Sequence, residues 1–345
     1  MTYLDMQIPN RAEHLWRYTP WSKIHPGEVD TIDKIKSSTV KVNTEIIVPN
    51  NSRNLSQNDD ISRAFLSEAN DNMFVIEIND EHPKMVDVDG GDDSSIVHLH
   101  IICKSSSSIT IKISGKCKWF GMHLTGEISP NSSLSIAMNN SLDDETTMVR
   151  CEDWNLARDA HLEYGELSIG GDYVKSDIRT TLDGVNSSLS QSISVIAGNK
   201  RHDDHHIEIL HKSSHTTSSL EVNSACSGKG HAIGTGLLII EKNCDGSDSG
   251  QVFKNLLLSE QAKAESIPEL EVLSDDVSAA HGAASSSVDK EQLHYLMSRG
   301  FTNDHAEALI VEGFLVNSFS KLQNKDTREY LISSLSEFLE HKLEA

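Results

Sequence analysis

Residues 108–128, SITIKISGKCKWFGMHLTGEI, decide which class of fold this sequence predicts. Ile109, Ile111 and Ile113 alternate with polar residues, and this period-two pattern is typical of a β-strand with one buried face. Similar runs lie on both sides, from MFVIEI at residues 73–78 to ELEVL at residues 269–273, with short polar turns between them. No long amphipathic helix interrupts the series, which excludes a fold of alternating strands and helices.

About 200 residues of short strands predict a mainly β core, which could be a sandwich, a barrel or a β-solenoid. No strict short repeat is present, so periodicity alone leaves these three architectures open. We predict a mixed or helical N-terminal region at residues 1–72, the β core at residues 73–286 and a helical domain at residues 287–345.

Amphipathic helices are predicted after the β core. The first has capping-box spacing between Asp289 and Gln292, and we expect it to end at Gly300. The apolar side of this helix carries Leu293, Leu296 and Met297. The pattern therefore predicts a helix with one face available for packing.

Two further helices follow. We expect Thr302 to cap the second helix, and Asp326, with Glu329 three residues later, to open the third. The apolar side of the third helix carries Leu331, Leu335 and Phe338. A short helical domain should thus complete the chain.

The overall charge excludes several classes of partner. The 345 residues carry 30 Lys and Arg against 52 Asp and Glu, which gives a net charge of −22. A chain this acidic is not expected to bind a nucleic-acid backbone or an anionic membrane surface. No secretory signal or membrane-length apolar segment is recognised, and five widely spaced cysteines without a CxxC motif indicate free thiols. We therefore expect a cytoplasmic protein with reduced cysteines.

The motifs taken alone do not predict an enzyme. The run RHDDHHIEILHKSSH at residues 201–215 contains His205, His211 and His215, which are weak candidates for metal ligands. If a strand starts at His205, then His205, Ile207, Glu208 and His211 do not all share a face. The sequence contains no GxSxG element and no Walker lysine loop, so a non-enzymatic β protein with a helical tail is favoured.

One block of the sequence resembles a known family. Residues 256–316 contain an apolar run, a P-x-L-E-hydrophobic element, an acidic pair, a His-Gly pair and a helix that ends in Ser-Arg-Gly. These elements are Pro268, Leu270, Glu271, Val272, Asp275, Asp276, Val277, His281, Gly282, Ser298, Arg299 and Gly300. The block strongly resembles the SufB/SufD family of iron–sulfur cluster assembly scaffolds.

Two upstream elements extend the resemblance. His211, His215, Thr216 and Ser218 match an H-x3-H-T-x-S element, and WRYTP at residues 16–20 matches an element of the SufD branch. The His281–Gly282 pair also resembles SufD, because SufB typically carries His-Glu there. The chain is therefore interpreted as SufD-like.

The resemblance implies a fold and a set of partners. It implies a right-handed parallel β-helix core between helical terminal regions. It also implies a SufB-like homologue that meets this chain along the β-helix, and a SufC-like ABC ATPase that docks on the C-terminal helices. A transient iron–sulfur cluster would form at the interface with the homologue, and ATP would be hydrolysed only on the ATPase partner. The chain itself is expected to be a non-catalytic scaffold that could also form a homodimer when alone.

The resemblance also points to His281 as a ligand of the nascent cluster. A neutral imidazole can bind iron, and Gly282 would let a partner backbone approach closely. Glu271 could orient the ring or serve a structural role. The alternative is that backbone hydrogen bonds satisfy His281 at a junction between strand and helix. Many relatives have a cysteine two residues earlier, where this chain has Ala279.

Several assignments stay open at this level. Thiolate ligands could come from the partner, or from Cys226 or Cys244, for which a buried structural role is the favoured reading. The faces of Leu293, Leu296 and Met297 and of Leu331, Leu335 and Phe338 are candidates for ATPase docking or for purely intramolecular packing. Flavin binding and the cluster type are undetermined. The alternatives for the whole chain are a self-associating structural solenoid and a β-helix enzyme acting on polysaccharides.

Overall fold

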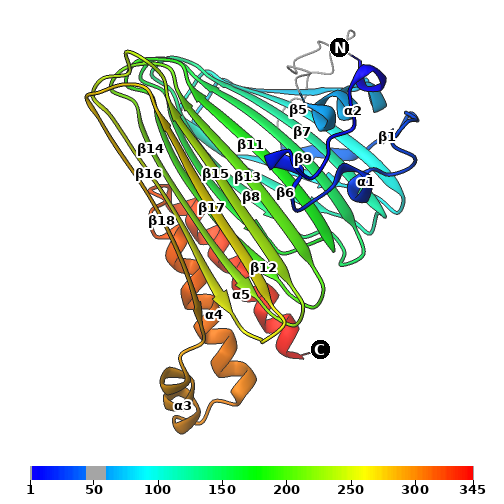
Figure 1. The fold of residues 1–345 in the computed structure, drawn as a ribbon, viewed down its shortest axis with the longest axis vertical. Coiled ribbons are helices and arrows are strands. Elements are labelled where there is room, and N and C mark those ends of the chain that lie inside the picture. Colours follow the sequence, from blue (N-terminus) through cyan, green and yellow to red (C-terminus); the bar gives the residue numbers. More distant parts are fainter. Residues whose placement is uncertain (1, 44–59, 345) are drawn as a thin grey trace.

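A coil of β-strands forms the body of the molecule (Figure 1). The structure is a computed structural model and describes residues 2–43 and 60–344. Strands make up about 47% of it and helices about 20%, and the strands wind through about eight turns of a β-solenoid. This confirms the predicted β core and selects the solenoid among the three architectures that the sequence pattern leaves open.

Two nine-stranded sheets form the walls of the solenoid. Sheet A contains β1 (Lys36–Ser37), β3 (Phe74–Ile78), β5 (Ser94–Cys103), β7 (Trp119–Ile128), β9 (Thr147–Leu156), β11 (Tyr173–Leu182), β13 (His202–His211), β15 (His231–Ile240) and β17 (Lys263–Val272). Sheet B contains β2 (Thr39–Val42), β4 (Lys84–Asp89), β6 (Ser107–Ser114), β8 (Ser133–Asn140), β10 (His161–Ser168), β12 (Ser188–Ala197), β14 (Thr217–Cys226), β16 (Ser247–Leu257) and β18 (Val277–Ser287).

The chain alternates between the two sheets along most of the coil. From β4 onward each strand pairs in parallel with the strand two positions later, whereas β2 pairs with β4 in antiparallel. Ile109, Ile111 and Ile113 of β6 point into the interior, where they are fully or almost fully buried. The period-two pattern thus fixes which side chains fill the solenoid.

The turns repeat one backbone conformation. Non-glycine residues with positive φ occur at successive corners of the coil: Asn131, Asp159, Asn186, Asn199, His215 and Asn243. Four of these six are asparagine, which tolerates the left-handed region better than most residues because its side chain can hydrogen-bond locally. The left-handed backbone conformation of these corners therefore explains why asparagine recurs in the polar turns of the sequence.

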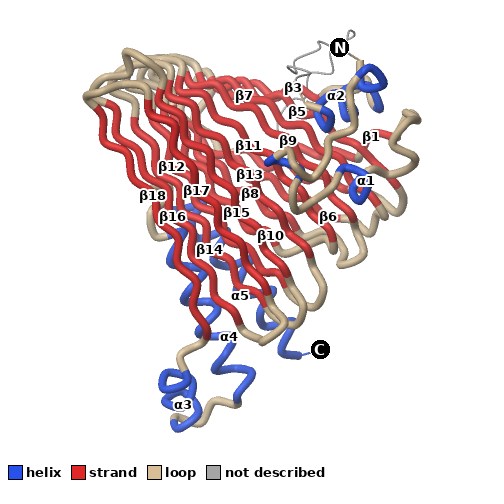
Figure 2. Tube along the Cα trace, in the orientation of Figure 1, coloured by secondary structure: helices blue, strands red, loops and turns tan. Residues whose placement is uncertain are grey.

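Helices cover the two sheets on their outer sides (Figure 2). The N-terminal region contributes the 3-10 helices η1 (Tyr3–Asp5) and η2 (His14–Trp16) and the helices α1 (Trp21–Ile24) and α2 (Ile61–Ala69). Their apolar residues pack with residues of β5, β7 and β9 on the outside of sheet A. The C-terminal helices α4 (Asn303–Phe319) and α5 (Lys325–Glu344) pack on sheet B, and α3 (Lys290–Ser298) precedes them. No helix among the described residues is long and apolar enough to cross a membrane.

The helix caps agree with prediction at two of three positions. Asp289 accepts a hydrogen bond from the backbone of Glu291, and Thr302 accepts one from the backbone of His305. The third helix was expected to open at Asp326, but Asn324 accepts the capping hydrogen bond from the backbone of Thr327. The capping residue therefore lies two positions earlier than expected, because a side-chain amide oxygen caps the helix as well as a carboxylate would.

Candidate functional site

The last turn of the solenoid is not covered by the described part of the chain. β17 ends sheet A and β18 ends sheet B, and the far edge of each strand pairs with no further described strand. Most residues of β18 are exposed, whereas almost every residue of β14 is buried. We call β17 and β18 the open end of the solenoid (Figure 1).

His281 stands on an inward-facing row of sheet B. In the register of successive strands Tyr164, Gln191, Leu220, Gln251 and His281 are direct neighbours. The first four of these residues are buried in the interior, but His281 is exposed. His281 is thus an interior position that is left uncovered because the coil stops.

The neighbour of His281 shows what a side chain does at this position of the coil. The amide Nε2 of Gln251 crosses the interior and donates a hydrogen bond to the backbone oxygen of Glu269 on β17, at 2.8 Å. His281 lies one coil further on, where the described chain has no next strand of sheet A to reach. The imidazole of His281 has no hydrogen bond to another described residue, so the alternative of a side chain satisfied by backbone bonds is not what the structure contains.

The residues beside His281 leave space for another molecule. A Cβ atom added at Gly282 would meet no other atom within 4 Å, so nothing in the described chain requires glycine there. Ala279 is the register neighbour of Ser249 and supplies no thiol. The close approach expected at Gly282 stays a prediction, and the open space is consistent with it.

Glu271 cannot orient the imidazole of His281. Its neighbour Leu270 packs against the interior core, and successive side chains of a strand point to opposite faces. Glu271 is therefore on the outer face of sheet A, where it is exposed, whereas His281 belongs to an inward row. The expected orienting role is wrong, because strand alternation separates the two side chains.

His205 is part of a buried charge network rather than a metal site. Its Nδ1 lies 2.6 Å from Asp203 and its Nε2 lies 3.1 Å from Glu166. Burial alone would lower the pKa of His205, but the two carboxylates raise it to about 9. Arg150 lies 2.5 Å from the same Glu166. Both imidazole nitrogens are occupied, so this candidate for metal binding is wrong.

His211 and His215 have structural roles. The Nδ1 of His211 lies 2.7 Å from the hydroxyl of Thr216, and its Nε2 lies 2.9 Å from the hydroxyl of Ser218. His215 occupies a corner with a φ of 58°, and its ring lies against Gly246. The described residues contain no group of three or more His, Cys, Asp or Glu side chains arranged to hold a metal ion. The H-x3-H-T-x-S element therefore builds a corner of the solenoid.

The five cysteines are free and buried. Burial raises the pKa of the Cys226 thiol to about 12, and it also raises the pKa of Cys244. The Sγ of Cys244 donates to the backbone oxygen of His211 at 3.3 Å. Both residues have the structural role that the sequence favours, and neither offers an accessible thiolate.

Comparison with known proteins decides the family. The family model described as "SUF system FeS cluster assembly, SufBD core domain" matches residues 86–314, which is more than half of the chain. The chain belongs to the SufBD family. Membership supports a role in iron–sulfur cluster assembly, and the match ends within α4, beyond the open end.

Relatives of this SufBD chain occur in mycobacteria. An iron–sulfur cluster assembly SufBD family protein of Mycobacterium leprae is 23% identical over 360 residues, which cover 98% of this chain and 91% of the relative. A SufBD family protein of Mycobacterium bovis is 27% identical over 209 residues, covering 58% of this chain and 52% of the relative. One of Mycobacterium tuberculosis is 29% identical over 163 residues, which are 47% of this chain but only 18% of that protein.

The WRYTP element of this SufBD chain packs on the outside of sheet A. Trp16 and Thr19 are buried, and the hydroxyl of Thr19 lies 2.8 Å from Nε2 of His202 and also bonds Asp204. Nearby, His14 forms an ion pair with Glu269 at 3.3 Å. This segment thus reaches β17 at the open end from the outer side.

The two candidate docking faces of the helices differ in exposure. Leu331 and Leu335 are fully buried in a cluster with residues of sheet B, and Phe338 packs against the same cluster. They serve intramolecular packing, and the expectation that they dock an ATPase is wrong in this structure. On α3, Leu293 and Leu296 are half-buried and Met297 is 44% exposed. The α3 face is the part of the prediction that remains available to a partner.

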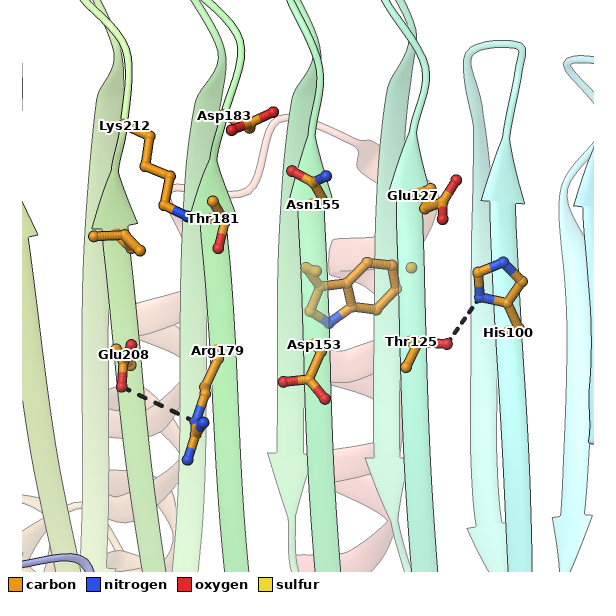
Figure 3. Close-up of a pocket in the computed structure, with 13 residues that line it drawn as sticks. His100, Thr125, Glu127, Asp153, Asn155, Arg179, Thr181, Asp183, Glu208 and Lys212 are labelled. Atoms are coloured by element: carbon orange, nitrogen blue, oxygen red, sulfur yellow. Dashed lines mark hydrogen bonds and ion pairs between the residues drawn. The ribbon is translucent and has the colours of Figure 1, made fainter. Parts of the chain in front are cut away.

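A polar groove of about 400 Å³ on the outer face of sheet A was not predicted from the sequence (Figure 3). Its lining includes Arg179, which lies 4.0 Å from Glu208, and His100, whose Nδ1 lies 2.8 Å from the Thr125 hydroxyl. Asp153 at its floor pairs with Arg63. Arg179, Glu208 and Asp153 of the lining thus have ion-pair partners within the chain. In the sequence, the only sign of this groove is that its residues take outward positions on strands with alternating polarity. That pattern does not distinguish a groove from ordinary exposed surface.

Proposed function

We propose that this SufBD chain is a SufD-like, non-catalytic scaffold subunit, and that a nascent iron–sulfur cluster forms at its open end against a SufB-like homologue. The observation that carries the proposal is the position of His281. It continues an interior row of the solenoid at the point where the described chain provides no cover. A partner that completes the coil would enclose His281 at the interface.

The chemistry of the open end suits a transient cluster. A neutral imidazole is a suitable iron ligand, and few ligands from this subunit favour later release of the cluster. The thiolates would come from the homologue, since the five cysteines of this chain are buried. The free edges of β17 and β18 offer backbone N–H and C=O groups to strands of a partner.

The ATPase partner would dock on α3. Tyr295 is 56% exposed and Met297 is 44% exposed, which is unusual for large apolar side chains on so short a helix. Because α4 and α5 pack on sheet B, a force applied to α3 would reach the solenoid through these helices. ATP hydrolysis on the partner would then shift the complex between states that hide and expose the cluster.

The test is anaerobic co-expression of the tagged chain with SufB-like and SufC-like proteins, followed by size exclusion and iron and sulfide analysis. His281→Ala should assemble normally but lose the cluster absorbance and most of the iron. The matched control is His82→Ala, an exposed histidine in the turn between β3 and β4. Met297→Asp should release the ATPase and keep the homologue.

Two results would overturn the proposal in different ways. If His281→Ala builds the cluster as well as the wild type does, His281 is not a ligand. If the wild-type chain elutes alone or only with itself, a self-associating structural solenoid becomes the better description of the chain.

A further inference from the structure

A cross-link between the last strands of the two sheets lies directly beside His281, and a second one joins Asn255 of β16 to Ser266 of β17 at 2.9 Å. Gln251 is the register neighbour of His281 and is only 2% exposed. Its side chain spans the interior and donates from Nε2 to the backbone oxygen of Glu269 at 2.8 Å. The amide thereby joins β16 of sheet B to β17 of sheet A at the open end.

The opposite wall is shaped to admit this side chain. Gly236 of β15 faces Gln251, and a Cβ atom at Gly236 would collide with the Gln251 Oε1 atom. The next inward residue of β15, Gly234, leaves room in the same way for the ring of Phe253. Two small residues in sheet A therefore reserve the space that Gln251 and Phe253 occupy.

β17 is held from its outer side at the same residue. The carboxylate of Glu269 lies 3.3 Å from Nδ1 of His14, while the backbone oxygen of Glu269 accepts the Gln251 amide from inside. The outer contact is partly exposed, with 33% and 43% of the two side chains accessible, and therefore contributes little. The inner contact is less exposed, because its donor Gln251 is only 2% accessible, so it is the stronger of the two restraints on this edge strand.

A second glutamine in the same row does not form such a cross-link, although Tyr164 of this row bonds Glu152 of sheet A further back along the coil. Gln191 is also 2% exposed, but neither its Oε1 nor its Nε2 has a hydrogen-bond partner among the described residues. Burial of a glutamine in this row thus does not by itself create a bridge between the sheets. The bridge is present where the coil ends and where β17 has lost the support of a following strand.

We propose that Gln251 is a positioning residue for His281, because its amide fixes β17 against β16 and so sets the geometry of the open end. This inference rests on the proposed function of His281 as an interface ligand. A ligand must be held to within about 0.5 Å by residues whose own positions are fixed. Gln251 supplies that restraint from the interior, and it does not touch the cluster.

The test compares Gln251→Leu with Gln191→Leu in the full chain. Leucine has a similar size and lacks the donor, and the second variant makes the same change two strands earlier in the row. Loss of the buried bond should speed hydrogen exchange of the β17 amides roughly two- to tenfold in Gln251→Leu only. The imidazole NMR signals of His281 should shift in Gln251→Leu and stay unchanged in Gln191→Leu.

A conservative variant separates positioning from general loss of stability. In Gln251→Glu the carboxyl group keeps the shape of the amide, and it can donate to the Glu269 oxygen only when protonated. Exchange of β17 should therefore be fast at neutral pH and return towards the wild-type rate in acid. In the complex, Gln251→Leu should lower the cluster content while the Gln191→Leu complex keeps it.

The possible outcomes are distinct. If β17 exchange and the His281 signals are the same in Gln251→Leu and Gln191→Leu, the positioning role is wrong. If these signals differ but His281→Ala keeps the cluster, the proposed function fails and the positioning of His281 has no role in cluster binding. If the signals differ and cluster content falls in both Gln251→Leu and His281→Ala, both proposals stand.

Discussion

The N-terminal region covers one surface of the solenoid, whereas the open end of the same solenoid is left uncovered by the described part of the chain. On the outside of sheet A, α2 buries Phe65 and Leu66 against Trp119 and places Arg63 among the carboxylates of β9 and β11. At the open end, β17 and β18 keep free edges, and the imidazole of His281 has no hydrogen bond to another described residue. One surface is completed by the chain itself and stabilises it. The other is left incomplete and is available to another molecule.

The largest effect is expected where the chain completes itself. Arg63 is buried, lies 2.9 Å from Asp153 and also pairs with Asp177. Arg63→Ala removes the buried cation that these two carboxylates share and leaves Asp177 with Arg179 alone, which should lower the free energy of unfolding by about 3–5 kcal/mol. Denaturant unfolding measures the change.

An exposed arginine provides the control for that comparison. Arg158 is 67% exposed and pairs only with its neighbour Asp159, at 3.1 Å. Arg158→Ala should change the free energy of unfolding by less than about 0.5 kcal/mol. Equal effects at Arg63 and Arg158 would show that the N-terminal region does not lock onto sheet A as described.

A smaller effect on the free energy of unfolding is expected when the pH is lowered. Burial lowers the pKa of His98 to about 3 and that of His202, His206 and His211 to about 4, so these side chains stay neutral in the folded chain. These four histidines take up protons in the unfolded chain as the pH falls through about 6.5 but not in the folded chain, so stability decreases from there towards about pH 4.

The pKa shift of His205 is in the opposite direction, so its effect on the pH dependence of stability is opposite too. Its pKa is raised to about 9, so its contribution is complete below about pH 6.5 and is lost as the pH rises towards 9. The free energy of unfolding, measured by denaturant titration from pH 5 to 9, should fall more steeply on the acid side. A steeper fall on the alkaline side would contradict the assignment of four neutral histidines, His98, His202, His206 and His211, against one charged histidine, His205.

The smallest effect on the free energy of unfolding is expected from a substitution at the open end. A side chain at Gly282 meets open space, and its φ is not positive, so Gly282→Ala should raise the free energy of unfolding by about 0.4–1 kcal/mol. In the complex the same change should weaken binding of the homologue. The control is Gly236→Ala, whose Cβ would collide with Gln251 and Phe253 and should cost about 1–3 kcal/mol. A loss of stability in Gly282→Ala would show that the open end is already packed.

Sequence reasoning was most successful where the signal is local. The alternation of Ile109, Ile111 and Ile113 predicts a strand and its buried face, and Asp289 and Thr302 predict two helix starts, because each depends on neighbouring residues only. The role expected for Glu271 failed because it depends on which face of β17 each side chain takes. The docking role of Leu331 and Leu335 failed because an apolar face does not specify what covers it.

The sequence by itself determined the β core, its inward residues, the C-terminal helices and the resemblance that marks His281. The resemblance also implied the β-helix, which the structure confirms. Only the tertiary structure decided that Gln251 bridges the two sheets at the last coil and that His281 stands in an interior row without cover. The reason is physical. Strand periodicity assigns each side chain to one of two faces, whereas burial depends on whether another strand follows in space, and here none of the described strands follows β18.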